Sequence, residues 1–254
     1  MEIQRIAAFD DNYIYLLRDP ETGAVAVVDP GDAAPVEAEL ARRGWRLTHI
    51  LTTHHHADHV GGVSELKKRY GCTVAGARAD QGRIPDMDAP LSDGEVFSVG
   101  SQQARVFAVP GHTSGHIAYY FADAGALFCG DTLFALGCGR LFEGTPAQMW
   151  ESLSRLRALP GDTRVYCAHE YTLSNARFAV TVDPDNPALA RRVDAVTAAR
   201  QRGEATVPFT LAEDAATNPF LRADDPAVQA AVGMSGAAPM AVFAEIRRRK
   251  DVFR

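Results

Sequence analysis

The stretch from Thr52 to His59, with the sequence TTHHHADH, constrains this chain most, because it places several metal-capable side chains on few residues. Imidazole nitrogens and carboxylate oxygens suit zinc and iron. In extended or loop backbone alternate side chains share a side, so His54 and His56 can bind one ion. Asp58 and His59 are adjacent and must diverge, which a second ion beside the first would require. The stretch therefore predicts a site for two metal ions.

Composition and charge narrow the class of protein. The chain has 254 residues and a formal net charge of −6, which argues against a nucleic-acid partner. No apolar run approaches the roughly 20 residues of a membrane span, and the first five residues lack a signal sequence. We therefore expect a cytoplasmic monomer with no membrane or nucleic-acid partner. The four cysteines are widely spaced, and we interpret them as free thiols: Cys72, Cys129, Cys138 and Cys167.

Turn residues and periodicity outline the first half of the chain. Apolar runs at 14–17 and 24–29 flank the turn sequence DPETG and predict a hairpin. A helix is expected from Pro35 to Arg43, ended by Gly44, and another from Val60 to Tyr70, ended by Gly71. Further strands are expected at 47–52, 73–77, 105–109, 117–121, 126–129 and 164–168.

Four of the expected strands lead into metal-capable residues. They are followed by the histidine cluster, His112, Asp131 and His169 respectively. Because α/β proteins place their chemistry at the carboxyl ends of strands, this pattern indicates one shared active-site rim. One metal could be held by His54, His56 and His112. A second could be held by Asp58, His59 and His169, with Asp131 bridging the two ions through its two oxygens.

The composition changes after Tyr171, where helical periodicity rich in Ala and Arg begins. We place a domain boundary there, with domains at 1–170 and 171–254. Before the boundary, Thr145 and Gln148 predict a capping box that starts a helix. Beyond it, helices are expected behind Pro187 and Pro239, with a loop at 217–220 between them.

Five motifs occur in order along the chain and carry a family resemblance. They are THHHADH at 53–59, PGHTSGH at 110–116, GDTLF at 130–134, GCGR at 137–140 and AHEYT at 168–172. Similarity extends to residues 11–15 and 247–250, so it covers nearly the whole chain. The sequence resembles the glyoxalase II (hydroxyacylglutathione hydrolase) family of the metallo-β-lactamase superfamily.

This resemblance implies the fold, the cofactors and the reaction. The fold would be an α/β (α+β) metallo-β-lactamase-like αββα sandwich followed by a C-terminal α-helical, glutathione-binding domain. Two divalent metal ions, with zinc first and iron or manganese as alternatives, would hold a bridging hydroxide. Asp58 and Asp131 would be the catalytic carboxylates around it. The reaction would cleave S-D-lactoylglutathione to D-lactate and glutathione in methylglyoxal detoxification.

A second set of residues matches the family's substrate contacts. Arg247 and Lys250 are three residues apart, so they share a helical face, and they match its glutathione-binding arginine and lysine. Tyr171 matches a substrate-contacting tyrosine, and Arg140 stands where relatives have Lys or Arg. Phe142 departs from the pattern, because many relatives have a tyrosine there. The missing phenol hydrogen bond would be worth about 0.5–1.5 kcal/mol.

Two histidines inside the motifs lie outside the ligand set. We interpret His55 and His116 as residues that support the ligands, because ligating groups need partners that fix their orientation.

Other functions compete with this interpretation. Another hydrolase of the same superfamily could act on a lactone, a β-lactam or a phosphodiester. Asp131 without a nearby cysteine ligand disfavours a lactamase that binds zinc through Cys, and the acidic charge disfavours a nuclease. A persulfide dioxygenase would use a single iron and fewer ligands. A non-catalytic metal-binding module would be expected to have lost ligands, and none is lost.

Overall fold

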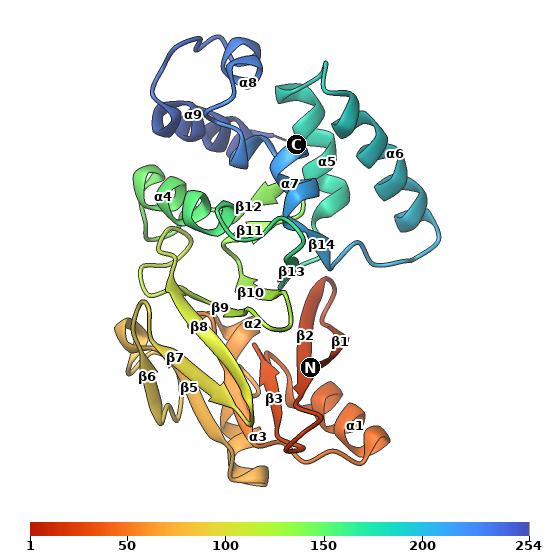
Figure 1. The fold of residues 1–254 in the computed structure, drawn as a ribbon, viewed down its shortest axis with the longest axis vertical. Coiled ribbons are helices and arrows are strands. Elements are labelled where there is room, and N and C mark those ends of the chain that lie inside the picture. Colours follow the sequence, from red (N-terminus) through yellow and green to blue (C-terminus); the bar gives the residue numbers. More distant parts are fainter. Residues whose placement is uncertain (254) are drawn as a thin grey trace. The chain divides into compact units, whose positions relative to one another are not determined.

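The computed structural model describes residues 1–253, which fall into two compact units (Figure 1). Unit 1 consists of Met1–Ala108 and Gly115–Gly130. Unit 2 consists of Val109–Ser114 and Asp131–Arg254.

The first sheet of unit 1 has six strands in the order β1-β2-β3-β4-β5-β6. The strands β1 to β3 pair antiparallel, and β3 to β6 pair parallel. The hairpin predicted around the DPETG turn is confirmed as β2 and β3. The bounds are β1 Glu2–Ala8, β2 Asn12–Arg18, β3 Val25–Val28, β4 His49–Leu51, β5 Thr73–Ala77 and β6 Ala89–Leu91.

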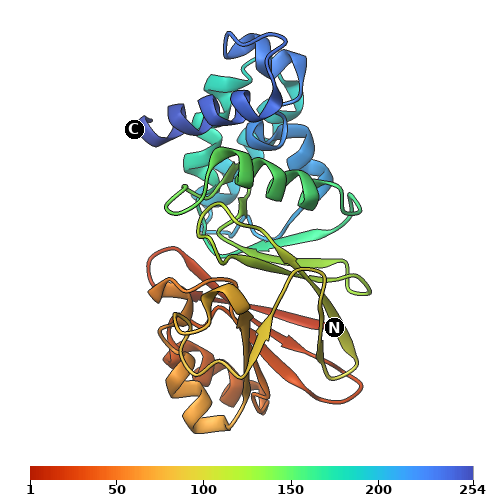
Figure 2. The ribbon, with the colours of Figure 1, turned by 90° about the vertical axis from the view of Figure 1, so that its left-hand side faces the viewer.

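Two helices cover one face of this sheet, and a second sheet covers the other. Ile14 and Leu16 pack in one apolar cluster with residues of α1 (Ala33–Arg43) and α3 (Val63–Tyr70). Tyr15 points the opposite way, as period-two alternation requires, and its ring centroid lies 5.5 Å from that of Phe128 in the second sheet. Figure 2 shows the orange helices on the side of the first sheet away from the yellow-green strands. The α1 prediction is confirmed, with Gly44 at φ 66°.

In unit 1 the second sheet contains four antiparallel strands: β7 Val96–Val99, β8 Gln102–Ala108, β9 Ile117–Phe121 and β10 Ala126–Gly130. The strands predicted at 117–121 and 126–129 are confirmed as β9 and β10, which pair with each other. The Tyr119 hydroxyl donates to the Thr52 carbonyl at 3.0 Å. This bond ties the second sheet to the end of β4, where the histidine cluster begins.

The single helix predicted from Val60 to Tyr70 is wrong at its start. A short helix, α2 (Ala57–Val60), precedes α3, and Gly61 and Gly62 separate them. A Cβ on Gly61 would lie 2.5 Å from the Gly31 carbonyl oxygen, and one on Gly62 would lie 2.6 Å from the Ala33 nitrogen. The two glycines therefore allow close contact with the turn after β3. Helical residues in α2 then include Asp58 and His59.

Unit 2 is mainly helical. Its strand pairs are β11–β12 and β13–β14, and η2 is a 3₁₀ turn. The capping box of α4 and the predicted starts of α6 and α9 at Pro187 and Pro239 are confirmed. The elements are β11 Leu133–Phe134, β12 Gly137–Cys138, α4 Pro146–Arg157, β13 Arg164–Cys167, α5 Thr172–Val182, α6 Pro187–Gln201, β14 Phe209–Thr210, α7 Leu211–Thr217, η2 Pro219–Leu221, α8 Pro226–Ala231 and α9 Pro239–Val252.

The loop predicted at 217–220 is wrong. Thr217 ends α7, and Pro219–Leu221 forms η2. Asn218 joins them, because its side-chain oxygen accepts from the Phe220 N–H at 3.0 Å.

A buried ion pair holds the β11–β12 segment in place. Arg192 donates to the carboxylate of Asp214 at 2.6 Å, and both side chains are almost inaccessible to solvent. Asp214 also accepts from the Leu136 N–H at 2.9 Å and from the Asn218 amide at 2.7 Å. Burial raises the pKa of Asp214, and the Arg192 charge opposes that rise. Breaking one partner would leave an uncompensated charge in the interior.

Replacing Arg192 by Ala should lower the free energy of unfolding by about 3–5 kcal/mol, because Asp214 would be buried without its cation. Denaturant unfolding of the metal-loaded protein measures this change. Arg191→Ala is the matched control, since Arg191 is the exposed neighbour on α6. Equal losses in the two variants would contradict a special role for the buried pair.

Candidate metal centre

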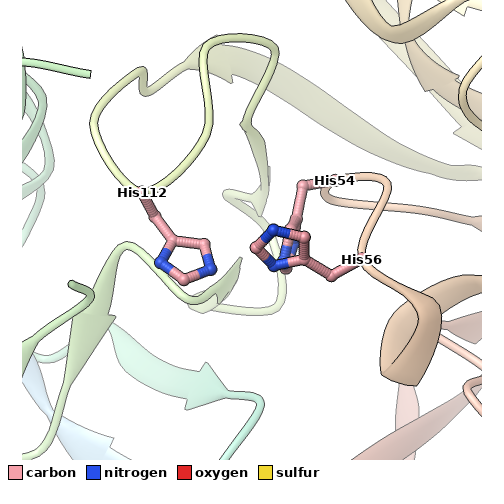
Figure 3. A group of neighbouring side chains, drawn as sticks. All are labelled: His54, His56 and His112. Carbon is pink, nitrogen blue, oxygen red and sulfur yellow. The ribbon is translucent and has the colours of Figure 1, made fainter. Parts of the chain in front are cut away.

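Each unit contains one group of candidate ligands, and the histidine cluster of unit 1 extends from the residues after β4 into α2. His54 and His59 are buried, whereas His56 and Asp58 are partly exposed. His54 Nε2 lies 3.1 Å from His56 Nδ1, and the ring centroids of His54 and His59 are 4.0 Å apart. Figure 3 shows His54 and His56 with their rings close together. Imidazole nitrogens from three rings are thus gathered in a small volume.

Outer hydrogen bonds fix the orientation of the buried rings. Asp29, which follows β3, accepts from the N–H and the hydroxyl of Thr53 at 2.7 Å each. The same carboxylate lies 3.1 Å from His59 Nδ1, and the Thr53 hydroxyl lies 3.0 Å from His54 Nδ1. With both Nδ1 atoms engaged in this way, the Nε2 atoms are the ones presented for a metal.

Asp58 has a partner on a distant strand. The side-chain amide of Asn12, the first residue of β2, donates to Asp58 Oδ2 at 3.0 Å. That oxygen lies 3.4 Å from His59 Nε2. Adjacent residues on α2 thus bring a carboxylate oxygen and an imidazole nitrogen together. The prediction that the side chains of Asp58 and His59 must diverge is therefore wrong.

Unit 2 contains the other ligand candidates, His112, Asp131 and His169, all buried. Figure 3 shows His112 on the loop that follows β8. The Nε2 atoms of His112 and His169 lie 3.4 Å from Asp131, each facing a different carboxylate oxygen. His112 Nδ1 is 2.8 Å from the Arg140 carbonyl oxygen. Asp131 therefore directs its two oxygens to two imidazoles, as a bridging carboxylate would.

The remaining motif histidines support this arrangement. His116 is buried, stacks on His54 with centroids 4.6 Å apart, and has Nδ1 at 3.1 Å from the Ile117 carbonyl oxygen. His55 Nδ1 lies 3.3 Å from the buried Asp80 carboxylate. Both contacts orient neighbours of the ligands.

Four of the five predicted substrate residues line one pocket in unit 2. The pocket has a volume of about 260 Å³ and is lined by Phe134, Cys138, Arg140, Tyr171, Ser174, Asn175, Arg247 and Lys250. Tyr171 stacks on His169, with centroids 4.7 Å apart and an angle of 2° between the rings, so the pocket adjoins a candidate ligand. Phe142 is not among the lining residues. It is 61% exposed and packs edge-on against His112.

The two basic residues of α9 differ in their surroundings. Arg247 is buried, donates to the Cys138 carbonyl at 3.0 Å, and pairs with Asp251 at 2.8 Å. Lys250 is half-buried and donates to the Ser174 carbonyl at 3.3 Å. Burial, with help from the Arg247 charge, lowers the pKa of the Lys250 ammonium to about 8. Its charge is therefore sensitive to mildly alkaline pH.

Sequence reasoning missed three residues of these groups. Asp29 entered only as the last residue of the apolar run 24–29, and its position at the end of a predicted strand was the available signal. Asn12 lay inside the family resemblance without a role. Asp251, which pairs with Arg247 and lies 3.6 Å from Arg140 Nε, follows Lys250 directly and carried no motif of its own.

Two family models match the chain. Residues 8–169 match the model described as the metallo-beta-lactamase superfamily, and residues 170–253 match the one described as the hydroxyacylglutathione hydrolase C-terminus. Together with the paired sheets and the histidine and aspartate groups, this match defines a metallo-β-lactamase-superfamily protein. The fold class predicted from the sequence is confirmed.

Curated relatives give the family within that class. The hydroxyacylglutathione hydrolase of Methylococcus capsulatus is 61% identical, with 100% of this chain and 99% of the relative covered. That of Rhodopseudomonas palustris is 54% identical, with 98% of each covered. The chain belongs to the hydroxyacylglutathione hydrolase family, as predicted.

Solved structures agree with the metallo-β-lactamase-superfamily fold. ETHE1 from Myxococcus xanthus has a TM-score of 0.70 and 25% identity, covering 100% of this chain and 93% of the other. TTHA1623 in a di-iron-bound form has a TM-score of 0.62 and 27% identity, covering 85% of this chain and 98% of the other. Among residues 1–253, no helix combines the length and apolar character needed to cross a membrane.

The donor atoms fit divalent metal ions. Neutral imidazole and carboxylate are ligands for zinc, iron and manganese, and the outer nitrogens of His54, His59 and His112 are engaged by oxygen atoms. The four cysteines are buried free thiols, as predicted, and Asp131 rather than a thiol faces the imidazoles.

Exchanging Asp29 for Ala should lower zinc affinity by about 10- to 100-fold, because Thr53 and His59 would lose the carboxylate that orients them. Competition with a chelating dye measures the affinity. Asp19→Ala is the matched control, since Asp19 is also a buried aspartate at a strand end, but it bonds to Thr22 and Ser101. An Asp29 variant that binds zinc as tightly as the Asp19 variant would refute the orienting role.

Proposed function

We propose that this chain hydrolyses S-2-hydroxyacylglutathione thioesters, S-D-lactoylglutathione above all, to the 2-hydroxy acid and glutathione. The observation that carries the proposal is the unit 2 pocket, where Arg140, Arg247 and Lys250 gather beside Tyr171. Glutathione has two carboxylates and several peptide groups, so a basic pocket of this kind suits it. The relatives at 61% and 54% identity bear the corresponding name.

We infer a dinuclear centre from the two ligand groups. One ion would be held by His54, His56 and His112, and the other by Asp58, His59 and His169, with Asp131 bridging. Within unit 1, His54 Nε2 and His56 Nδ1 lie 3.1 Å apart, and within unit 2, Asp131 faces His112 and His169 with separate oxygens. Zinc is the first candidate, with iron or manganese as alternatives. The di-iron form of TTHA1623 supports the two-ion count.

Metal bound at such a centre lowers the pKa of water from 15.7 to about 7 and polarises a carbonyl oxygen. The chain itself supplies position and charge balance. Among the seven assigned ligands, Asp58 and Asp131 are the two that carry negative charge, which balances part of the positive charge of the ions. We therefore assign these two carboxylates as catalytic. Asn12 and the Arg140 carbonyl hold Asp58 and His112 in place.

The basic pocket binds the carrier and leaves the acyl carbon to the metal centre. Tyr171 connects the two, because its ring stacks on His169 while it lines the pocket. Arg247 is already held by Cys138 and Asp251, so little side-chain freedom is lost when a carboxylate arrives. Binding is therefore preorganised at Arg247 and adjustable at Lys250.

The second candidate function is hydrolysis of another substrate, a β-lactam, a lactone or a phosphodiester, by the same fold. A solved relative is described as a B3 metallo-beta-lactamase, but at 22% identity it shows the fold alone. A lactone carries no anionic group, and a β-lactam or a phosphodiester typically carries a single one, whereas glutathione offers two carboxylates to a pocket with two arginines and a lysine.

Steady-state hydrolysis of S-D-lactoylglutathione should exceed that of a β-lactam, a lactone and a phosphodiester on the same sample. Elemental analysis of that sample, prepared without chelator, should give close to two metal ions per chain.

Asp131→Ala should lose one or both ions and nearly all activity, because ions about 3.5–4 Å apart need an anion between them. A metal content that stays near one under saturating zinc, iron and manganese would exclude the dinuclear centre.

Lys250 should make the Michaelis constant depend on pH. Its pKa is lowered to about 8, so the ammonium is charged below that pH and becomes neutral above it. KM for a glutathione thioester should therefore rise as pH increases through about 8, while kcat changes less. Lys250→Ala should raise KM by about 10-fold or more at pH 7, because a charge-assisted bond is worth about 1.5–3 kcal/mol.

Two controls isolate this effect. Lys250→Arg keeps its charge, so its KM should stay flat from pH 7 to 9. Arg248→Ala removes the same charge from an exposed residue of α9 and should leave KM unchanged. Equal KM changes with a thioester that lacks both carboxylates would show that Lys250 does not bind the carrier.

A further inference from the structure

Unit 2 has a second pocket between α5 and α6, which lie side by side in Figure 1. Its volume is about 370 Å³, and we call it the α5–α6 pocket. It shares no lining residue with the basic pocket, and it contains none of the residues assigned above to the metal centre or to the carrier. Its lining includes Leu173, Ala176 and Arg177 of α5 and Val193, Thr197 and Arg200 of α6.

Helical spacing brings these side chains to the pocket. On α5 they lie three and four residues after Leu173, and on α6 four and seven residues after Val193, so each set shares one face of its helix. Ser174 and Asn175, which line the basic pocket, lie on another face of α5. The helix α5 therefore contributes a different face to each pocket.

Apolar side chains form the floor of the α5–α6 pocket. Ala176 is buried in an apolar cluster that joins α5 to α6, and Val193 packs against this cluster. Leu173 and Val193 are only partly buried, so some of their apolar surface stays open to solvent at the pocket. A hydrocarbon chain lying on this floor would remove that surface from water, which favours binding.

Two guanidinium groups border the floor, and they differ in their partners. Arg200 lies 3.6 Å from the Glu170 carboxylate and donates to the Glu204 carbonyl at 2.7 Å. The exposed guanidinium of Arg177 forms neither a hydrogen bond nor an ion pair with the rest of residues 1–253. A guanidinium presents two parallel N–H donors that match the two oxygens of a carboxylate. The pocket thus combines an apolar floor with an uncompensated positive charge.

We propose that the α5–α6 pocket binds a monocarboxylate with an unbranched apolar chain of medium length. The carboxylate pairs with Arg177, and the chain covers Leu173 and Val193. This site goes beyond the thioester hydrolysis proposed above and does not rest on it. An alcohol of the same length lacks the charge, and an alkylammonium ion is repelled by both arginines, so each should bind more weakly. Acetate keeps the charge but leaves the floor exposed.

Isothermal titration of the metal-loaded protein with octanoate, below the concentration at which micelles form, tests the site. Octanoate should bind about 10-fold or more tightly than octan-1-ol, octylammonium or acetate, because only octanoate uses both the charge and the floor. Arg177→Ala should lower the octanoate affinity about 10-fold. Arg177→Lys keeps the charge and loses the paired donors, so its affinity should fall less.

Two variants serve as controls, and neither should change the octanoate affinity. Arg191→Ala removes an exposed arginine of α6 that lies two residues before Val193 and so on another face of the helix. Lys250→Ala removes a cation from the basic pocket. An affinity that falls in the Lys250 variant and not in the Arg177 variant would place octanoate in the basic pocket and overturn the proposal. Absence of octanoate binding, or equal affinity for octanoate and octan-1-ol, would overturn it as well.

Discussion

The hydrogen bonds of the Asp29 carboxylate are the interaction on which the unit 1 ligand group depends. One carboxylate holds Thr53 through two bonds and His59 through a third, and Thr53 in turn contacts His54. Asp29 can do this because it follows β3 with φ 49°, which turns the chain sharply toward the neighbouring strand end. Gly31 then passes so close to α2 that a Cβ would lie 1.9 Å from the Asp58 carbonyl oxygen. Ligand geometry in unit 1 is thus set by the turn after β3.

Unit 2 couples its ligands to its pocket through one short segment, Asp131 to Arg140. The carboxylate at its start faces two imidazoles, while the residue at its end offers its carbonyl to His112 and its side chain to the basic pocket. The Arg192–Asp214 pair and Asn218 hold the middle of the segment through backbone atoms of Leu136, Phe134 and Gly137. A buried ion pair rarely adds stability over apolar packing, so its use here is better explained by positioning.

Much of the architecture was predictable from local signals. Pro35 and Gly44 gave the bounds of α1 nearly correctly, and the capping box gave the start of α4, because these signals act within a few residues. The break between α2 and α3 was not predictable, since it depends on contact of Gly61 and Gly62 with the turn after β3. Two-residue strands such as β11 and β12 lack any periodicity from which they could be inferred.

The candidate site was likewise predictable only in part from the sequence. Ligand types and their order along the chain were visible as motifs, and so was the basic end of α9. The partners that support the ligands were not visible in the sequence. Asn12 and Asp58, for example, are 46 residues apart, and their contact exists only in the folded chain. The proposed boundary after Tyr171 stays a prediction. Phe134, Cys138 and Arg140 line the basic pocket, so residues before that boundary also contribute to it.

Charge balance in the basic pocket determines which residue discriminates between carriers. Asp251 pairs with Arg247 and lies near Arg140, so both guanidinium groups already have an anion beside them. Lys250 contacts a carbonyl and the rings of Phe178 and Phe253, and it forms no ion pair with the other residues of 1–253. Its lowered pKa expresses the same imbalance, because burial without a carboxylate disfavours the charged form. A carboxylate of the carrier would supply the missing anion at Lys250, whereas at Arg247 it would have to share the cation with Asp251. Discrimination between charged and uncharged carriers should therefore rest mainly on Lys250, with Arg247 chiefly shaping the pocket.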